Sequence, residues 1–195
     1  MDAIEAILTR RSTRNFKPDM IGQDKLDTIL DAALQAPSGG NSQTNHFFVI
    51  RNKDVLQTLI AMTEAAFSEM EATENTYASL KRSIAASKKG GYVFCYNAPL
   101  LIVVANQKDY GNNMADCACA IENMMVAANA LDLGSCWINQ LRWLNENPRL
   151  VEYLRTLGMK ESERVYGAVI IGYPASGLPN RNLMPRKGNE ITYID

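Results

Sequence analysis

The segment from Asn112 to Leu133 constrains the fold most, because it has a helical pattern and is apolar nearly all round. A helix of that kind lies inside a structure. Its polar side chains fall on two opposite lines, with Glu122, Asn129 and Asp132 on one and Asp116 and Asn123 on the other. Buried polar groups need partners. We therefore expect this helix to pack across an interface or beneath a polar ligand; the alternative is a core helix with one solvent-exposed edge.

The rest of the chain alternates between helical and strand patterns. Helices are expected over 2–10, 23–36 and 148–157, and strands over 46–50, 99–105, 134–140 and 165–173. The apolar run 99–105 is typical of a strand that is buried on both faces. Residues 54–90 are helical but weakly apolar, with a polar break near 72–76, and form a candidate lid or substrate-facing insertion.

The tail from Ala175 to Asp195 has too little apolar surface to form a core by itself. Such a segment is either disordered or wrapped over a partner.

Composition excludes several classes of function. The 195 residues fit one domain, 1–195, and a net charge of −1 with interspersed signs argues against a nucleic-acid partner. The longest apolar run is too short to span a bilayer, and the N-terminus lacks the pattern of a signal peptide. We expect a cytoplasmic protein with no membrane partner.

The four cysteines show no disulfide or metal-site spacing, and His46 is the single histidine. A metal site is therefore not expected. The absence of a G-x-G-x-x-G sequence also argues against a nicotinamide-binding Rossmann domain.

Two short segments carry chemistry suited to a planar phosphorylated ligand. The run from Ala36 to Gln43 combines accessible backbone donors with the amides of Asn41 and Gln43, although it could also be a helix stop followed by a polar loop. The run from Arg10 to Arg14 concentrates cations and hydroxyls fit for a phosphate, although it could also be a solvated helix end.

These segments, taken with three later ones, resemble the nitroreductase family of FMN-dependent oxidoreductases. The motifs follow the family's order: 10–16, 36–43, the helix leading to 134–138, then 170–174 and 185–187. The resemblance implies an α+β fold, an α-β sandwich in which helices flank a central mixed β-sheet, made as an intertwined homodimer. It also makes 54–90 a variable helical insertion and 175–195 a tail that wraps the partner subunit.

The resemblance further implies FMN as cofactor, with NADPH or NADH as electron donor and a small electron-poor molecule as acceptor. The implied FMN contacts are Arg10, Arg11, Ser12 and Arg14, then Pro37, Ser38, Gly39, Asn41 and Gln43 from the other subunit, then Ile138, Asn139 and Gln140, and Arg186 and Lys187 from the tail. Because flavin N5 carries the chemistry, no catalytic side chain is expected. Thr44-Asn45 replaces the Pro-Trp of many members, which leaves the shape of the acceptor side open.

Two other functions fit parts of the sequence. A protein that stores or senses FMN without turnover would need the same contacts. A thiol hydrolase is suggested by Gly134-Ser135-Cys136-Trp137, but in the papain-like enzymes with this motif the histidine lies downstream, whereas His46 lies far upstream.

Overall fold

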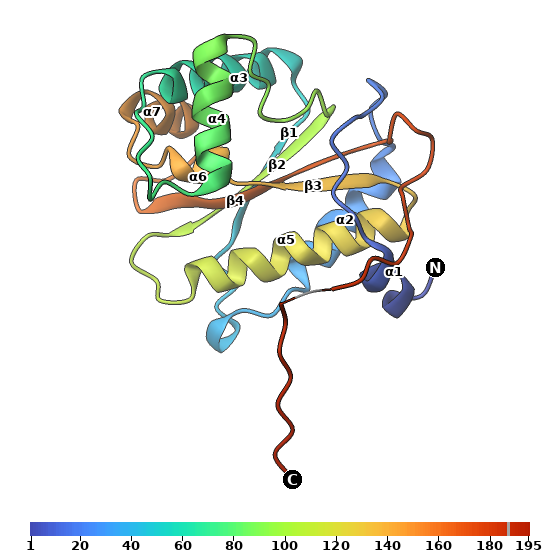
Figure 1. Ribbon diagram of the computed structural model, residues 1–195. Coiled ribbons are helices and arrows are strands. Elements are labelled where there is room, and N and C mark those ends of the chain that lie inside the picture. The colour runs from blue at the N-terminus through green and yellow to red at the C-terminus, as the bar shows by residue number, and fades with distance from the viewer. Residues whose placement is uncertain (187) are drawn as a thin grey trace.

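A four-stranded sheet lies at the centre of the computed structural model, which describes residues 1–186 and 188–195 (Figure 1). The strands are β1 (His46–Ile50), β2 (Leu100–Gln107), β3 (Gly134–Ile138) and β4 (Glu163–Gly172), in the order β1-β2-β4-β3. The four strands that were expected are therefore confirmed, with β3 ending two residues earlier than predicted.

Helices cover both faces of this sheet, as Figure 1 shows. They are α1 (Ala3–Thr9), α2 (Gln23–Leu34), α3 (Lys53–Ser68), α4 (Ala78–Lys89), α5 (Asn113–Ala130), α6 (Gln140–Trp143) and α7 (Pro148–Thr156), with a 3-10 helix, η1 (Gly39–Asn41). Helices α2 and α5 pack on one face, while α3, α4, α6 and α7 lie on the other. The α+β sandwich is confirmed.

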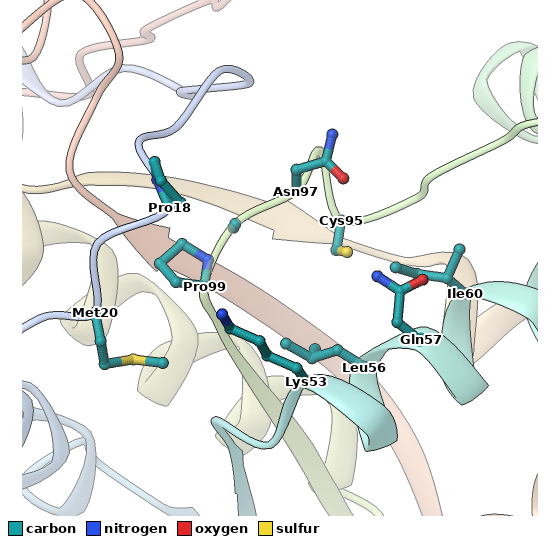
Figure 2. A pocket seen from close by; sticks show the side chains of 10 residues that line it. Pro18, Met20, Lys53, Leu56, Gln57, Ile60, Cys95, Asn97 and Pro99 are labelled. Atoms are coloured by element: carbon teal, nitrogen blue, oxygen red, sulfur yellow. The ribbon is translucent and has the colours of Figure 1, made fainter.

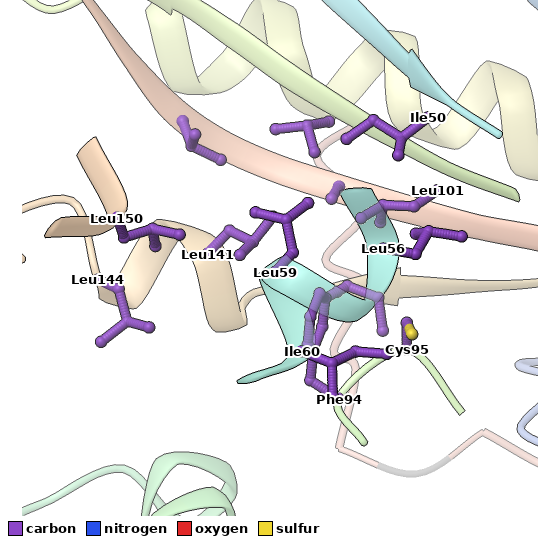
Figure 3. Close-up of a cluster of buried hydrophobic side chains, with 14 of the residues drawn as sticks. Ile50, Leu56, Leu59, Ile60, Phe94, Cys95, Leu101, Leu141, Leu144 and Leu150 are labelled. Carbon is purple, nitrogen blue, oxygen red and sulfur yellow. The ribbon is translucent and has the colours of Figure 1, made fainter. Parts of the chain in front are cut away.

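The two faces of β2 supply the two halves of the core. Leu100, Ile102 and Val104 pack with α2 and α5, whereas Leu101 and Val103 pack with α3, α6 and α7. This alternation follows from the two-residue repeat of a strand. Figure 3 shows the second cluster, in which side chains from α3 and from the α6–α7 region meet the sheet. The strand is therefore buried on both faces, as its apolar run predicts.

The sheet is antiparallel at each of its three strand pairings, and the prediction of a mixed sheet is wrong for the strands of one chain. The connections from β1 to β2 and from β3 to β4 each begin and finish at the same end of the strands. The two strands that each one joins therefore run in opposite directions. Strands β2 and β3 run parallel, but β4 separates them. Among the described residues, parallel pairing is confined to an isolated bridge between Ser12 and Ser135.

Helix α5 packs on the sheet and on α2, which confirms it as the central helix. Its buried Asn129 donates to Ala6 O and lies 3.0 Å from Thr9 Oγ1, so it anchors α1. This docking turns Ala6 and Thr9 inward and leaves the larger apolar side chains of α1 outside, with Ile4 66% exposed. One chain alone therefore presents an apolar surface on α1.

The segment 54–90 divides into α3 and α4, with a break at 69–77 that includes the expected one. Helix α3 belongs to the core, since Leu59 and Phe67 are fully buried. Helix α4 contributes fewer buried side chains, namely Ser83, Ile84 and Ser87. A lid role, which remains a prediction, therefore applies best to α4.

The C-terminal tail is attached to the body at its start and exposed at its end. Arg181 Nη2 donates to Asn129 O at 2.7 Å and to Asp132 Oδ1 at 2.6 Å. Beyond this anchor Ile191, Tyr193 and Ile194 are exposed. The last residues extend away from the body in Figure 1.

Candidate functional site

The arginine-rich segment is held against the start of β3 by the backbone. Thr13 N donates to Ser135 O at 2.8 Å, and Ser12 forms its parallel bridge with Ser135. Gly134 permits this approach, because a Cβ there would lie 2.6 Å from Thr13 Oγ1. The fold thus brings 10–14 beside the strand that leads to 138–140.

Cys136 lies at the centre of this junction, near Arg14, Ser12 and Arg10. Burial raises the pKa of the Cys136 thiol, and the two guanidinium groups and the hydrogen bond with Ser12 offset this only in part. The thiol is therefore neutral at pH 7 and is no activated nucleophile.

His46 is also unavailable to Cys136. It lies on β1, at the opposite edge of the sheet from β3, and its Nδ1 is 2.9 Å from Oε2 of Glu163. The thiol hydrolase is thus excluded by geometry as well as by protonation.

A cavity of about 460 Å³ opens beside this junction. Arg14 and the stretch from Cys136 to Gln140 form one side, and α4 with the residues around it forms another. The α4 side and its neighbours contribute Tyr77, Ser79, Arg82, Tyr92, Tyr96 and Trp143. The described lining includes two arginines and no carboxylate, so the cavity favours anionic or electron-rich groups.

Two amides at the end of β3 orient one wall of the cavity. Asn139 Oδ1 accepts from Trp137 Nε1 at 2.9 Å, and Asn139 N donates to Gln140 Oε1 at 3.1 Å. The buried Gln140 donates from Nε2 to Tyr92 Oη at 2.9 Å. Gln140 thus ties the strand end to the segment after α4, and burial raises the pKa of the Tyr92 hydroxyl, which remains protonated.

Of the other predicted cations, those that the structure describes lie outside this cavity. Arg10 is half-buried and its Nε is 3.2 Å from Glu122 Oε1. Arg11 donates to the carbonyls of Leu8, Arg10 and Asn182, so it fastens the tail to the N-terminal segment. Arg186 is exposed, and Lys187 lies outside the described residues.

The loop 37–43 is built on the N-terminal end of α5. Gly39 N donates to the buried Asp116 at 3.1 Å, and the Tyr110 hydroxyl lies 3.0 Å from both Gly39 O and Asp116 Oδ2. A Cβ at Gly39 would lie 2.5 Å from that hydroxyl, so the close packing requires glycine.

The polar tip of this loop is exposed and strained. Asn41 and Gln43 have φ values of 56° and 49°, in the left-handed region that few non-glycine residues adopt. Gln43 N donates to Ser38 Oγ, and Gln43 Nε2 donates to Asn41 Oδ1 at 3.0 Å. Pro37 is exposed beside them. Strain of this kind is concentrated at functional sites.

One chain does not bring this loop to the arginine-lined cavity. The loop is anchored at Asp116, whereas the N-terminal segment contacts α5 at Glu122 and Asn129. At about 1.5 Å per residue, these anchors lie roughly 9 to 20 Å from Asp116 along the helix axis. The predicted residues therefore form two groups, with Arg10, Ser12, Arg14 and 138–140 in one and 37–43 in the other.

The sequence marked the region of α4 as a candidate lid or substrate-facing insertion, but it did not point to the individual residues that line the cavity from this side. Ser79, Arg82, Ser83 and Ala86 recur at helical spacing and share one face of α4. Because this face is polar, a search for apolar periodicity overlooks it. A search for a polar helical face followed by aromatic residues would have found it.

A second cavity, of about 400 Å³, contains none of the predicted residues (Figure 2). Side chains of α3, including Leu56 and Ile60, meet Pro99 and the buried Cys95 there. Its lining is mostly apolar, with Lys53, Gln57 and Asn97 as polar groups. Its described lining lacks the arginines and strand-end amides of the first cavity. We therefore take the first cavity as the candidate site.

Residues 1–186 and 188–195 contain neither a candidate metal site nor a membrane-spanning helix. No cluster of three or more His, Cys, Asp or Glu side chains there could hold a metal ion. No helix in these ranges is long and apolar enough to cross a bilayer.

Comparison with known proteins places this geometry in a family. The Nitroreductase family profile matches residues 7–173. A crystal structure of a nitroreductase with bound FMN from Bacteroides fragilis has a TM-score of 0.86 and 35% identity, with 100% of both chains covered. A nitroreductase with bound FMN from Desulfitobacterium hafniense has a TM-score of 0.82 and 29% identity, again with 100% of both chains covered.

A curated relative from Archaeoglobus fulgidus is provisionally named NADH dehydrogenase/NAD(P)H nitroreductase. It is 29% identical over 173 residues, which cover 89% of this chain and 86% of the relative. Profile, structures and relative agree with one another: the chain belongs to the nitroreductase family.

Proposed function

We propose that this protein is an FMN-dependent oxidoreductase that passes electrons from NADPH or NADH to a small electron-poor acceptor. The observation that carries the proposal is the cavity in which Arg14 meets the strand end 138–140 without any carboxylate in its described lining. The FMN-bound nitroreductases of the same fold support the choice of cofactor.

The residues present fit FMN in chemical type. Arg14 would stabilise the negative charge that a reduced flavin carries near N1 and O2. Arg10 and Ser12 are the cation and hydroxyl suited to the phosphate and ribityl end, joined by Arg11, Arg186 and Lys187. Main-chain N–H groups of Ile138, Asn139 and Gln140 would serve N5 and O4, and Asn139 N–H would first have to leave Gln140 Oε1.

When bound, FMN would supply the chemistry, which is ping-pong hydride transfer between the nicotinamide donor and the acceptor. For a nitro acceptor the sum R–NO2 + NAD(P)H + H⁺ → R–NO + NAD(P)⁺ + H2O balances. The chain's own residues bind and orient both partners. A cavity without a carboxylate or an ionised thiol fits a reaction that needs no acid or base from the protein.

The site would be completed by a second copy of the chain. The loop 37–43 and the arginine segment beside the cavity are anchored at separate points along α5, so the loop would serve the partner's cavity. The apolar surface of α1 and the exposed end of the tail are two further features that an intertwined homodimer would cover. In that assembly residues 175–195 would wrap the partner.

The test is to mix the purified yellow protein with NADPH or NADH without oxygen and record absorbance between about 350 and 500 nm, the range of oxidised flavin absorption. We expect rapid bleaching, followed by recovery of colour when a quinone or nitroaromatic is added. Colour that persists for many minutes would favour storage or sensing of FMN. Well-folded protein that is colourless, monomeric and indifferent to added FMN would contradict the proposal itself.

A further inference from the structure

We infer that the electron acceptor is an aromatic acid, an electron-poor ring that bears a carboxylate, and that Arg82 on α4 binds the carboxylate. This inference rests on the proposed function and concerns the side of the same cavity that FMN contacts leave unassigned.

The described lining of the cavity holds two arginines and no compensating acid. Arg14 and Arg82 both line it, and neither takes part in an ion pair among the described residues. In the proposed function, Arg14 stabilises the reduced flavin. Arg82 comes from α4 and is not among the residues assigned to FMN by the proposed function.

The Arg82 side chain is oriented by its own helix. Its Nη2 donates to Ser79 Oγ at 2.9 Å, one turn earlier on α4. As an acceptor of this bond, Ser79 keeps its own proton to donate elsewhere. A guanidinium group presents paired N–H donors that match a carboxylate, so Arg82 and Ser79 together form an anion-binding pair.

Aromatic side chains stand beside this pair. Tyr77 caps the N-terminus of α4, is 66% exposed, and lies edge-on to Trp143 with ring centroids 6.1 Å apart. Trp143 is in turn held edge-on by the buried Phe67 at 6.5 Å. Aromatic walls of this kind bind planar rings by stacking and edge contacts.

The cation and the aromatic walls together select the substrate class. A neutral nitroaromatic would use only the walls and would leave Arg82 without an anion. An aliphatic acid would use only Arg82. An aromatic acid uses both, and the loss of one charge-assisted hydrogen bond is worth about 10- to 100-fold in affinity.

The experiment compares 4-nitrobenzoate with methyl 4-nitrobenzoate as acceptors for the FMN-loaded protein and for Arg82→Gln. We expect KM for 4-nitrobenzoate to rise about 10- to 100-fold in Arg82→Gln, while KM for the ester changes by less than about threefold. Lys89→Gln is the matched control, because it removes the same charge from α4 at an exposed position outside the cavity. It should alter neither value.

A binding measurement gives a second readout that does not depend on turnover. Titration of the oxidised protein with benzoate, followed by the flavin absorbance change, should give a Kd about 10- to 100-fold higher for Arg82→Gln than for wild type. Arg82→Lys, which keeps the charge but loses the paired donors, should fall between the two.

Three results would overturn the inference. They are equal changes in KM for acid and ester, an unchanged Kd for benzoate, and a rise confined to KM for NADPH or NADH, which would assign Arg82 to the donor's phosphates. If the wild-type protein accepts no hydride at all, the proposed function fails, whereas the benzoate titration still tests Arg82.

Discussion

Arg14 is exposed at the rim of the cavity and has no carboxylate partner among the described residues, so its charge is available to a ligand. Loss of this charge should affect the reduced flavin more than the oxidised one. We expect Arg14→Ala to retain FMN but to lower its two-electron potential by roughly 20 to 60 mV, equivalent to about 1–3 kcal/mol. Dye-coupled reductive titration measures this shift. Arg14→Lys keeps the charge and should restore most of the potential, and an equal drop in both variants would remove the electrostatic role.

The buried carboxyl group of Glu163 makes the stability of the fold depend on pH. Burial raises the pKa of Glu163, but hydrogen bonds from His46 and from Lys160 N–H outweigh it, so the pKa lies below the usual 4.5. A lowered carboxyl pKa stabilises the folded state above the unfolded value, and this stability is lost as pH falls through the folded value.

We therefore expect Glu163→Gln to reduce the free energy of unfolding at pH 7 by about 1–3 kcal/mol. The difference from wild type should begin to shrink as the pH falls below about 4.5, where Glu163 of the unfolded chain takes up a proton, and should be lost once the pH has fallen through the lower pKa of the folded state. Urea unfolding at several pH values measures both effects. Glu161→Gln, at an exposed neighbouring position, is the control; a difference that stays constant down to low pH would contradict the prediction.

At the scale of elements, the approach of 10–14 to β3 depends on one missing side chain. A Cβ at Gly134 would lie 2.7 Å from Thr13 Cβ, which is backbone-proximal and cannot swing away. We expect Gly134→Ala to lower the free energy of unfolding by about 1–3 kcal/mol and to weaken FMN binding by about tenfold or more, since the arginines shift. Denaturation and FMN titration test this.

Gly111→Ala is the matched control, because a Cβ at Gly111 meets nothing within 4 Å. Normal FMN affinity in Gly134→Ala would show that the packing of 12–13 on β3 does not position the cation.

Most elements could be predicted from the sequence because their signals are local. The apolar run of β2 and the helix stop before Pro37 each depend on a few adjacent residues. Strand direction could not be predicted in this way, because it depends on whether each connection returns to the same end of the strands or crosses to the other.

The same distinction applies to the site: residues with a local motif could be predicted, and residues placed only by packing could not. Arg14, Asn139 and Gln140 were found from sequence motifs and do line one cavity. Arg82 and Trp143 were missed because they enter the cavity only through the packing of α4 and α6 beside β3. The grouping of 37–43 with Asp116 was also missed, since only the folded chain brings Gly39 to the start of α5.

At the scale of the whole molecule, the two groups of predicted residues would meet only between subunits. This arrangement predicts complementation. Arg10→Ala in one chain and Asn41→Ala with Gln43→Ala in the other should each abolish FMN retention in a homodimer. A purified heterodimer of the two has both defects in one site and none in the other.

We expect that heterodimer, isolated with two different tags, to hold about half the FMN of the wild-type dimer, since one of two equivalent sites is intact. Flavin absorbance per protein measures it. Each homodimeric variant serves as its own control. A heterodimer without FMN would show that both groups act on the cofactor from the same chain.

The separate anchoring of the loop and the arginine segment along α5 has a further consequence. If each bound cofactor bridges two chains, its apparent affinity depends on mass action between the chains. Dilution would then release colour before the fold is lost, and added FMN would draw dilute chains back into pairs. The yellow colour of a preparation would thus report how many chains are assembled.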